Sequence, residues 1–155
     1  MHKLLFVLLA GLMIVGCSGR AEVLPNTDKS LRRKPPEFAA DAAKRVYPAD
    51  AEIAPDAVSR AQVGYTLDVL EVANLSDQDW ENVEVWVNQK YVVSIAKIER
   101  AIDGDSTGRV KVFNFRMLYD NAGRHFPTDN SKTLVEKVEV FHAGKLYNVP
   151  FNQAD

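Results

Sequence analysis

The chain has 155 residues, a formal net charge of −2 and 46% hydrophobic residues. That length suits one domain of ordinary size, and the apolar content is enough for a packed core. Because the charge is nearly balanced, nothing points to nucleic acid as a partner. Cys17 is the only cysteine, which excludes an intrachain disulfide and a zinc site built from cysteines.

The first residues have the layout of a secretory signal peptide. A positive start, MHK, precedes an apolar run, LLFVLLAGLMIV, and Gly16 is the small residue expected before a cleavage site. The apolar run is shorter than the roughly 20 residues that a membrane-spanning helix needs. We therefore predict a signal peptide over residues 1–16, with cleavage between Gly16 and Cys17.

The stretch IVGC at residues 14–17 resembles the lipobox of bacterial lipoproteins. The resemblance implies that the thiol of Cys17 carries a diacylglycerol and that the new amine is acylated after cleavage. Membrane lipid is then the first partner of the chain, because two or more acyl chains give stable anchoring. Ser18 follows the cysteine, which in a host with two membranes resembles the outer-membrane default and implies the periplasmic face.

Residues 17–34 are polar and lack periodicity, so they are predicted to form the lipidated start and a flexible tether. The basic cluster LRRK within this stretch either contacts anionic head groups or is an ordinary solvated linker. A short helix and a linker are expected over residues 35–61. Two prolines begin the helix, which runs to Tyr47 with acidic residues early and basic residues late, as the helix dipole favours. The loop PADAEIAP follows it.

From residue 62 the hydrophobic period changes to two, the period of half-buried strands. Six or seven short segments alternate, separated by turns such as NLSDQDW, NQK, DGDSTG and HAGK. RVKVFNFRMLY is the longest expected strand, and TLVEKVEVF is expected to pair with KLYNVPF. With no βαβ alternation, this spacing predicts an all-β antiparallel sandwich over residues 62–155.

The region 62–152 resembles an immunoglobulin-like domain in size and strand number, without its usual disulfide. The stretch FRMLYDNAGRHF also resembles the central hairpin of FxLYD-type envelope domains, with one more residue between Phe115 and Leu118. The upstream VANLSDQDWENVEVWV is similar to another segment of those domains. The resemblance implies an immunoglobulin-like fold with a binding or scaffolding role.

The strand NVEVWV places a large aromatic residue among alternating valines. The three valines share one strand face, so Glu84 and Trp86 share the other. If the valines face the core, Trp86 and Glu84, with Tyr91 just past the turn, form a candidate binding site for an envelope protein or a glycan. The alternative is that the predicted helix covers this face and buries Trp86. Trp80 is expected to close the edge of the sandwich.

Carboxylate and histidine patterns give no catalytic motif. His125 and His142 each lie by a turn, and no serine carries an elbow motif. Asp103 and Asp105 alternate as calcium ligands do, but no carboxylate closes the loop, which favours a plain polar turn. Glu136 and Glu139 form a pair of carboxylates on a strand, and we interpret both as solvated charges.

We therefore expect a membrane-anchored envelope lipoprotein that acts as a non-catalytic binding or structural module. No catalytic residue, metal site or cofactor is expected. A small-ligand or metal-binding lipoprotein and a hydrolase are the alternatives.

Overall fold

The computed structural model describes residues 29–55, 59–100, 108–128 and 133–154. Cys17 and the signal segment lie outside these residues, as do Asp103 and Asp105 of the polar turn. Strands dominate the described chain, and one short helix precedes them. The expectation of an all-β chain with a short N-terminal helix is therefore confirmed.

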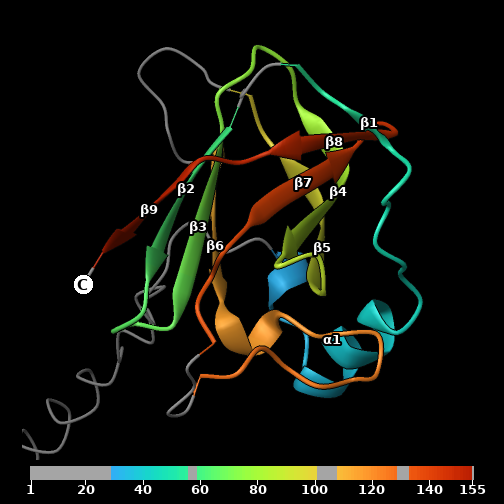
Figure 1. Cartoon of the computed structure of the whole chain (residues 1–155), viewed down its shortest axis with the longest axis vertical. Coiled ribbons are helices and arrows are strands. Elements are labelled where there is room, and N and C mark those ends of the chain that lie inside the picture. The colour runs from blue at the N-terminus through green and yellow to red at the C-terminus, as the bar shows by residue number, and fades with distance from the viewer. Residues whose placement is uncertain (1–28, 56–58, 101–107, 129–132, 155) are drawn as a thin grey trace, which may run out of the picture.

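Two β-sheets lie face to face (Figure 1). Sheet A has the strand order β1-β8-β7-β4-β5, and sheet B has the order β6-β3-β2-β9. The strands of sheet A are β1 (Glu52–Ile53), β4 (Trp80–Val87), β5 (Tyr91–Ile98), β7 (Val138–His142) and β8 (Lys145–Asn148). The strands of sheet B are β2 (Ser59–Gly64), β3 (Val69–Asn74), β6 (Val110–Asn114) and β9 (Phe151–Ala154).

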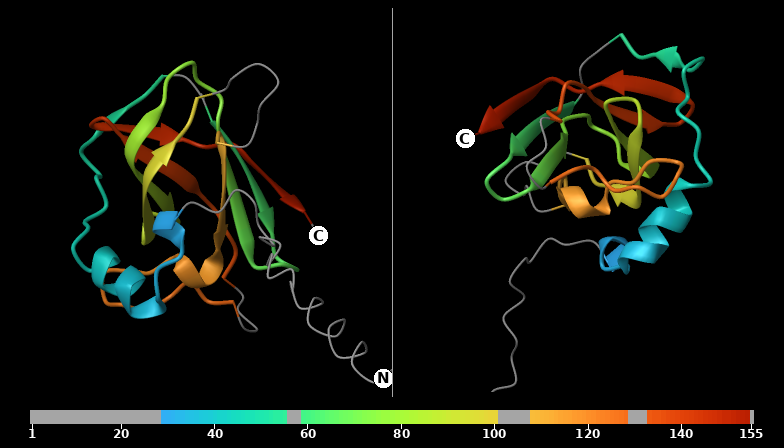
Figure 2. Two further views of the ribbon diagram at one scale, coloured as in Figure 1. Left: turned by 180° about the vertical axis from the view of Figure 1, so that it is seen from behind. Right: turned by 60° about the horizontal axis from the view of Figure 1, so that its bottom comes forward.

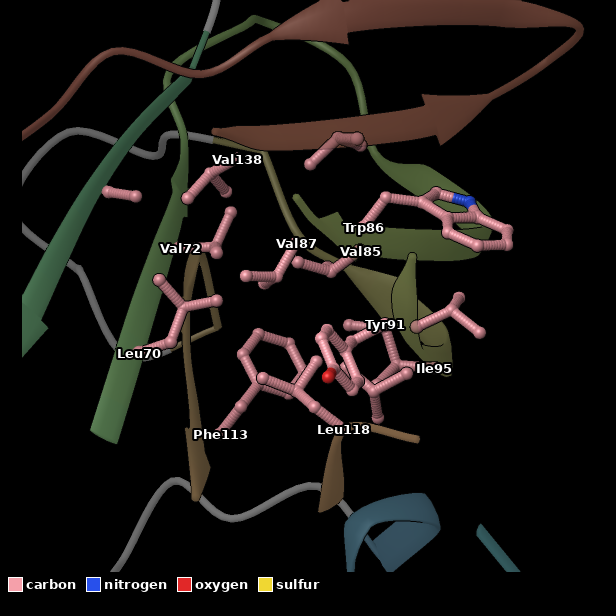
Figure 3. Close-up of a cluster of buried hydrophobic side chains, with 14 of the residues drawn as sticks. Leu70, Val72, Val85, Trp86, Val87, Tyr91, Ile95, Phe113, Leu118 and Val138 are labelled. Atoms are coloured by element: carbon pink, nitrogen blue, oxygen red, sulfur yellow. The ribbon is translucent and has the colours of Figure 1, made fainter. Parts of the chain in front are cut away.

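Side-chain alternation along β4 decides what faces the space between the sheets. Val85 and Val87 point toward Leu70 and Val72 of sheet B, whereas the Trp86 ring points the other way (Figure 3). All four of these aliphatic side chains are fully buried. The prediction that the valines of NVEVWV share one face is confirmed, and this face is the core.

Two hairpins in sheet A close on pairs of residues with positive φ. Asn88 and Gln89, with φ of 52° and 56°, lie in the three-residue link from β4 to β5, and Ala143 and Gly144, with φ of 50° and 78°, link β7 to β8. Positive φ at both central positions is the mark of a type I′ turn, whose twist matches the adjoining strands. The turns expected at NQK and HAGK are confirmed.

The longest expected strand is shorter than predicted. Strand β6 ends at Asn114, whose side-chain oxygen accepts the Arg116 N–H at 2.9 Å, and the 3-10 helix η2 (Phe115–Met117) follows. This local hydrogen bond competes with continuation of the sheet. The chain then crosses to sheet A, where Tyr119 and Val92 exchange backbone hydrogen bonds at the edge of β5.

The pairings expected at the chain's end are also only partly observed. Strand β8 pairs with β7 as predicted, but Pro150 ends this pairing because proline cannot donate to a sheet ladder. The next residues form β9, which switches to sheet B and runs parallel to β2. Glu52 and Ile53, expected in a loop, form β1 parallel to β8. The sheets are therefore mainly, not entirely, antiparallel, and β2 begins at Ser59, before the expected boundary at residue 62.

Replacing Leu70 with alanine tests this core. Leu70 is fully buried between the sheets, so Leu70→Ala is expected to lower the free energy of unfolding by about 2–5 kcal/mol. Leu75→Ala, at an exposed site of the β3–β4 turn, is the control and is expected to change it by less than about 0.5 kcal/mol. Urea denaturation measures both values, and equal losses would contradict the placement of Leu70.

Candidate functional site

The outer face of sheet A, where Trp86 and Glu84 lie, is covered by the chain's own N-terminal segment. Residues 29–48, here called the N-terminal cover, contain η1 (Lys29–Leu31), α1 (Pro35–Ala42) and the turn after it (Figure 2). Trp86 is only 2% exposed beneath this cover. Of the two possibilities raised by the sequence, the structure has the buried tryptophan, so Trp86 is not available as an exposed binding residue.

The first turn of α1 explains where the cover begins. Two prolines occupy the first helical positions, where their missing N–H groups cost nothing, and Glu37 accepts the Lys34 N–H at 2.6 Å. Phe38 and Ala42 form the buried face of the helix. The helix ends at Ala42, earlier than the predicted end at Tyr47. The residues after Ala42 leave the helix and reach across sheet A.

Tyr47 is the residue that lies directly over Trp86. The two rings meet edge to face, with centroids 5.4 Å apart and an interplanar angle of 83°. The indole N–H of Trp86 donates to Glu84 at 2.9 Å, so the polar atom of the buried ring has a partner. The structure therefore brings Trp86 and Glu84 together, as the strand pattern predicts, but beneath Tyr47.

Tyr91, the third predicted site residue, lies on the other face of the sheet. It pairs in register with Val87 and is buried in the core, where its ring meets Phe126 edge to face at 5.1 Å. Figure 3 shows Tyr91 pointing inward, on the side of the sheet away from Trp86. The grouping of Tyr91 with Trp86 was wrong, because Tyr91 lies directly opposite Val87 and side chains of directly opposed residues point to the same face of a sheet.

Arg45 joins the cover to sheet A, because it forms one ion pair within the cover and one with β4. Its guanidinium contacts Asp41 of α1 at 3.0 Å and also contacts Glu84 of β4. Asp41 in turn accepts the hydroxyl of Ser94 on β5 and contacts Arg33 at 3.3 Å. Two arginines thus balance two carboxylates, and these half-buried charges link α1 to both strands of the β4–β5 hairpin.

The Asp41 carboxyl has a lowered pKa. Burial alone would raise its pKa, but the hydrogen bonds and charge of Arg45, the hydroxyl of Ser94 and the guanidinium of Arg33 outweigh burial. Burial likewise opposes the charged form of Arg45, yet Asp41 and Glu84 raise the pKa of its guanidinium. Both groups therefore stay ionised in this contact.

A second polar contact holds the end of the cover. The Tyr47 hydroxyl donates to the Glu139 carboxylate, with distances of 2.9 and 3.0 Å to its two oxygens, and Lys137 contacts the same carboxylate at 2.7 Å. Burial and the Glu139 charge raise the pKa of the Tyr47 phenol. Glu139 is 2% exposed, so its interpretation as a solvated charge was wrong. It pairs in register with Trp86, and the cover closes over both.

The other residues singled out in the sequence, Trp80 and the histidines, contact neighbouring rings or backbone. Trp80 is buried at the start of β4, an inner strand of sheet A, where it stacks on His142 and Tyr147 with ring centroids at 5.8 and 5.4 Å. His125 is exposed, and its Nδ1 lies 2.7 Å from the Phe126 carbonyl oxygen. Within the described ranges, no cluster of three or more His, Cys, Asp or Glu side chains is arranged to hold a metal ion.

One open pocket of about 250 Å³ lies beside the cover. Its lining includes the two arginines of the ion-pair network and Asn82, together with Ser30, Ser94, Ile95 and Ala96. Because Asp41 and Glu84 neutralise both arginines, the pocket offers hydrogen-bond donors but little net positive charge. This chemistry suits a small polar group better than a free anion.

Comparison with known proteins finds no match to this chain among protein-family models, curated proteins or solved structures. Among the residues described here, none of the helices has the length and apolar character needed to cross a membrane.

Two substitutions at Tyr47 separate its ring from its hydroxyl. Tyr47→Phe keeps the ring on Trp86 but leaves Glu139 with one hydrogen-bond donor fewer, so we expect a loss of about 1–3 kcal/mol. Tyr47→Ala uncovers Trp86, so we expect a larger loss and a red shift of tryptophan emission. The emission is measured in a Trp80→Phe background, which leaves Trp86 as the only tryptophan. If Tyr47→Phe and Tyr47→Ala had the same emission maximum, this would contradict the conclusion that the Tyr47 ring covers Trp86.

The pH dependence of stability tests Asp41. Because its pKa in the folded chain is below the unfolded value of about 3.9, its carboxylate stabilises the fold above that value. This stabilisation is lost as the pH falls through the folded pKa. The Tm of Asp41→Asn should therefore lie below wild type at neutral pH and converge with it in acid, while Asp50→Asn, at an exposed site, should follow wild type throughout. A gap that persists in strong acid would refute this role.

Proposed function

We propose that this chain is a bacterial envelope lipoprotein, held on a membrane by lipid on Cys17, whose β-sandwich is a non-catalytic binding or structural module. The observation that carries the proposal is the stretch LLFVLLAGLMIVGC, an apolar segment followed by a small residue and the only cysteine. This order of residues supplies a signal segment and a lipid-accepting thiol at one point in the chain.

The position of the first described element supports this arrangement. η1 begins at Lys29, twelve positions after Cys17. A chain of that length spans at most about 40 Å when fully extended. A lipid on Cys17 would therefore keep the sandwich within one small domain's width of the membrane surface.

The way the cover is fixed supports a structural or binding role. The described segment closest in sequence to Cys17 is attached to sheet A through Arg33, Arg45 and Tyr47, so a pull on the anchor that reaches this segment would pass into the sheet. We further propose an immunoglobulin-like arrangement, supported by two facing sheets whose chain crosses between them at η2 and at Pro150.

We propose that a partner binds at the edge of sheet B formed by β9. Strand β9 pairs with β2 on one side only, and its Asn152 and Gln153 are exposed. An edge strand presents unpaired backbone donors and acceptors that an extended segment of another protein can extend as a new strand. The outer face of sheet A does not serve, because the cover already occupies it.

Replacing Cys17 tests the anchor. In the bacterial host, wild type is expected in the membrane fraction, with a mature mass that includes the diacylglycerol and the amine-linked acyl chain. Cys17→Ser is expected to lose these groups and to leave the membrane fraction, while Ser18→Ala should keep both. Mass spectrometry of the mature protein and fractionation measure the result. Wild-type protein with a free thiol at Cys17 would overturn the proposal.

A further inference from the structure

Three exposed aliphatic side chains belong to segments at one end of the sandwich. Val46, Leu67 and Leu134 have exposed fractions of 85%, 73% and 53%. They come from three segments far apart in the sequence: the turn after α1, the β2–β3 turn, and the stretch that leads into β7. Each of them would lose apolar surface from water if this end of the sandwich met an apolar phase.

Hydrogen bonds join the three segments. The Val135 N–H donates to the Tyr65 hydroxyl at 2.9 Å, which ties the stretch containing Leu134 to the turn containing Leu67. Asn88 in the β4–β5 turn donates to the Leu134 carbonyl at 2.8 Å. Its neighbour Gln89 donates to the Tyr47 hydroxyl at 2.9 Å, next to Val46. The three aliphatic side chains thus belong to one connected end of the molecule.

The N-terminal cover belongs to this same end. Figure 2, right, turns the end forward and shows η1, α1, η2 and the β2–β3 turn together on it. The described chain begins there at Lys29, twelve positions after Cys17. Strand β1, which carries the exposed Ile53, and the β3–β4 turn, which carries the exposed Leu75, lie at the other end (Figure 1).

The exposed charges of this end include both signs. Lys90 of the β4–β5 turn and Arg116 of η2 are exposed basic residues, and Glu136 is an exposed acid. Exposed charges of both signs at this end are compatible with the head-group layer of a bilayer, which solvates charged groups. A lipid anchor also raises the local concentration of bilayer at this end, so that a contact too weak to bind alone becomes occupied.

We propose that this end of the sandwich lies against the phospholipid surface, with Leu67 and Leu134 inserted at the boundary between head groups and acyl chains. The proposal rests on the lipid anchor proposed above. It gives the domain a fixed orientation, in which β1 and the β3–β4 turn point away from the membrane.

Single introduced cysteines test this orientation in the full-length protein. If the Cys17 sulfur is bound in a thioether, then Leu67→Cys, Leu134→Cys, Ile53→Cys and Leu75→Cys each provide the only free thiol. Each variant is labelled with the same environment-sensitive dye and reconstituted into phosphatidylethanolamine–phosphatidylglycerol vesicles. Vesicle flotation and quenching by a nitroxide on the lipid acyl chains are then measured.

Orientation and anchoring fail in distinguishable ways. We expect a blue shift and strong lipid quenching at positions 67 and 134, and an aqueous spectrum with little quenching at positions 53 and 75. Flotation with no difference among the four sites would overturn the orientation and leave the anchor standing. A wild-type chain that takes up the dye at Cys17 and fails to float would overturn both proposals.

Discussion

The structure depends on one contact, the Arg45 guanidinium held between Asp41 of α1 and Glu84 of β4. Both carboxylates also accept a hydrogen bond from another side chain. Asp41 accepts one from the Ser94 hydroxyl, and Glu84 accepts one from the indole N–H of Trp86. Loss of either carboxylate would leave Arg45 with one ion-pair partner instead of two, and would also remove the acceptor of the Ser94 hydroxyl or of the Trp86 indole N–H. This contact fixes the chain after α1 on sheet A, and the Tyr47–Glu139 contact fixes the end of the cover over Trp86.

Because of the cover, the two sheets differ in how far their outer faces are buried. In sheet A the middle of β4 is buried on both faces, by the core on one side and by Tyr47 on the other. In sheet B, β2 alternates between buried and exposed residues, so its outer face stays open. A strand buried on both faces has a nearly continuous apolar sequence, as WVNQKYVV has around its turn, whereas a half-covered strand alternates as SRAQVG does. Proposed contacts with other molecules therefore fall on sheet B and on the ends of the sandwich.

Local patterns predicted the parts of this fold that local interactions determine. The common face of the β4 valines, the turns at Asn88 and Ala143 and the start of α1 at two prolines all follow from neighbouring residues. The parallel pairing of β9, the strand at Glu52 and the burial of Glu139 depend on partners far along the chain, which no local period reveals. The covered tryptophan was one of two open alternatives, because a lone aromatic residue on an outer face fits either a binding surface or a docked helix.

The central claim is that the N-terminal cover is part of the folded domain rather than a tether lying on it. Native-state hydrogen exchange at neutral pH measures this most directly, through the Ala43 amide, which donates to the Ala39 carbonyl at 3.0 Å, and through the amides of β4. If the cover and sheet A form one cooperative unit, the Ala43 amide will be protected to nearly the same free energy as the Val85 amide. Exchange at Ala43 as fast as in an unstructured peptide, with β4 still protected, would contradict the account.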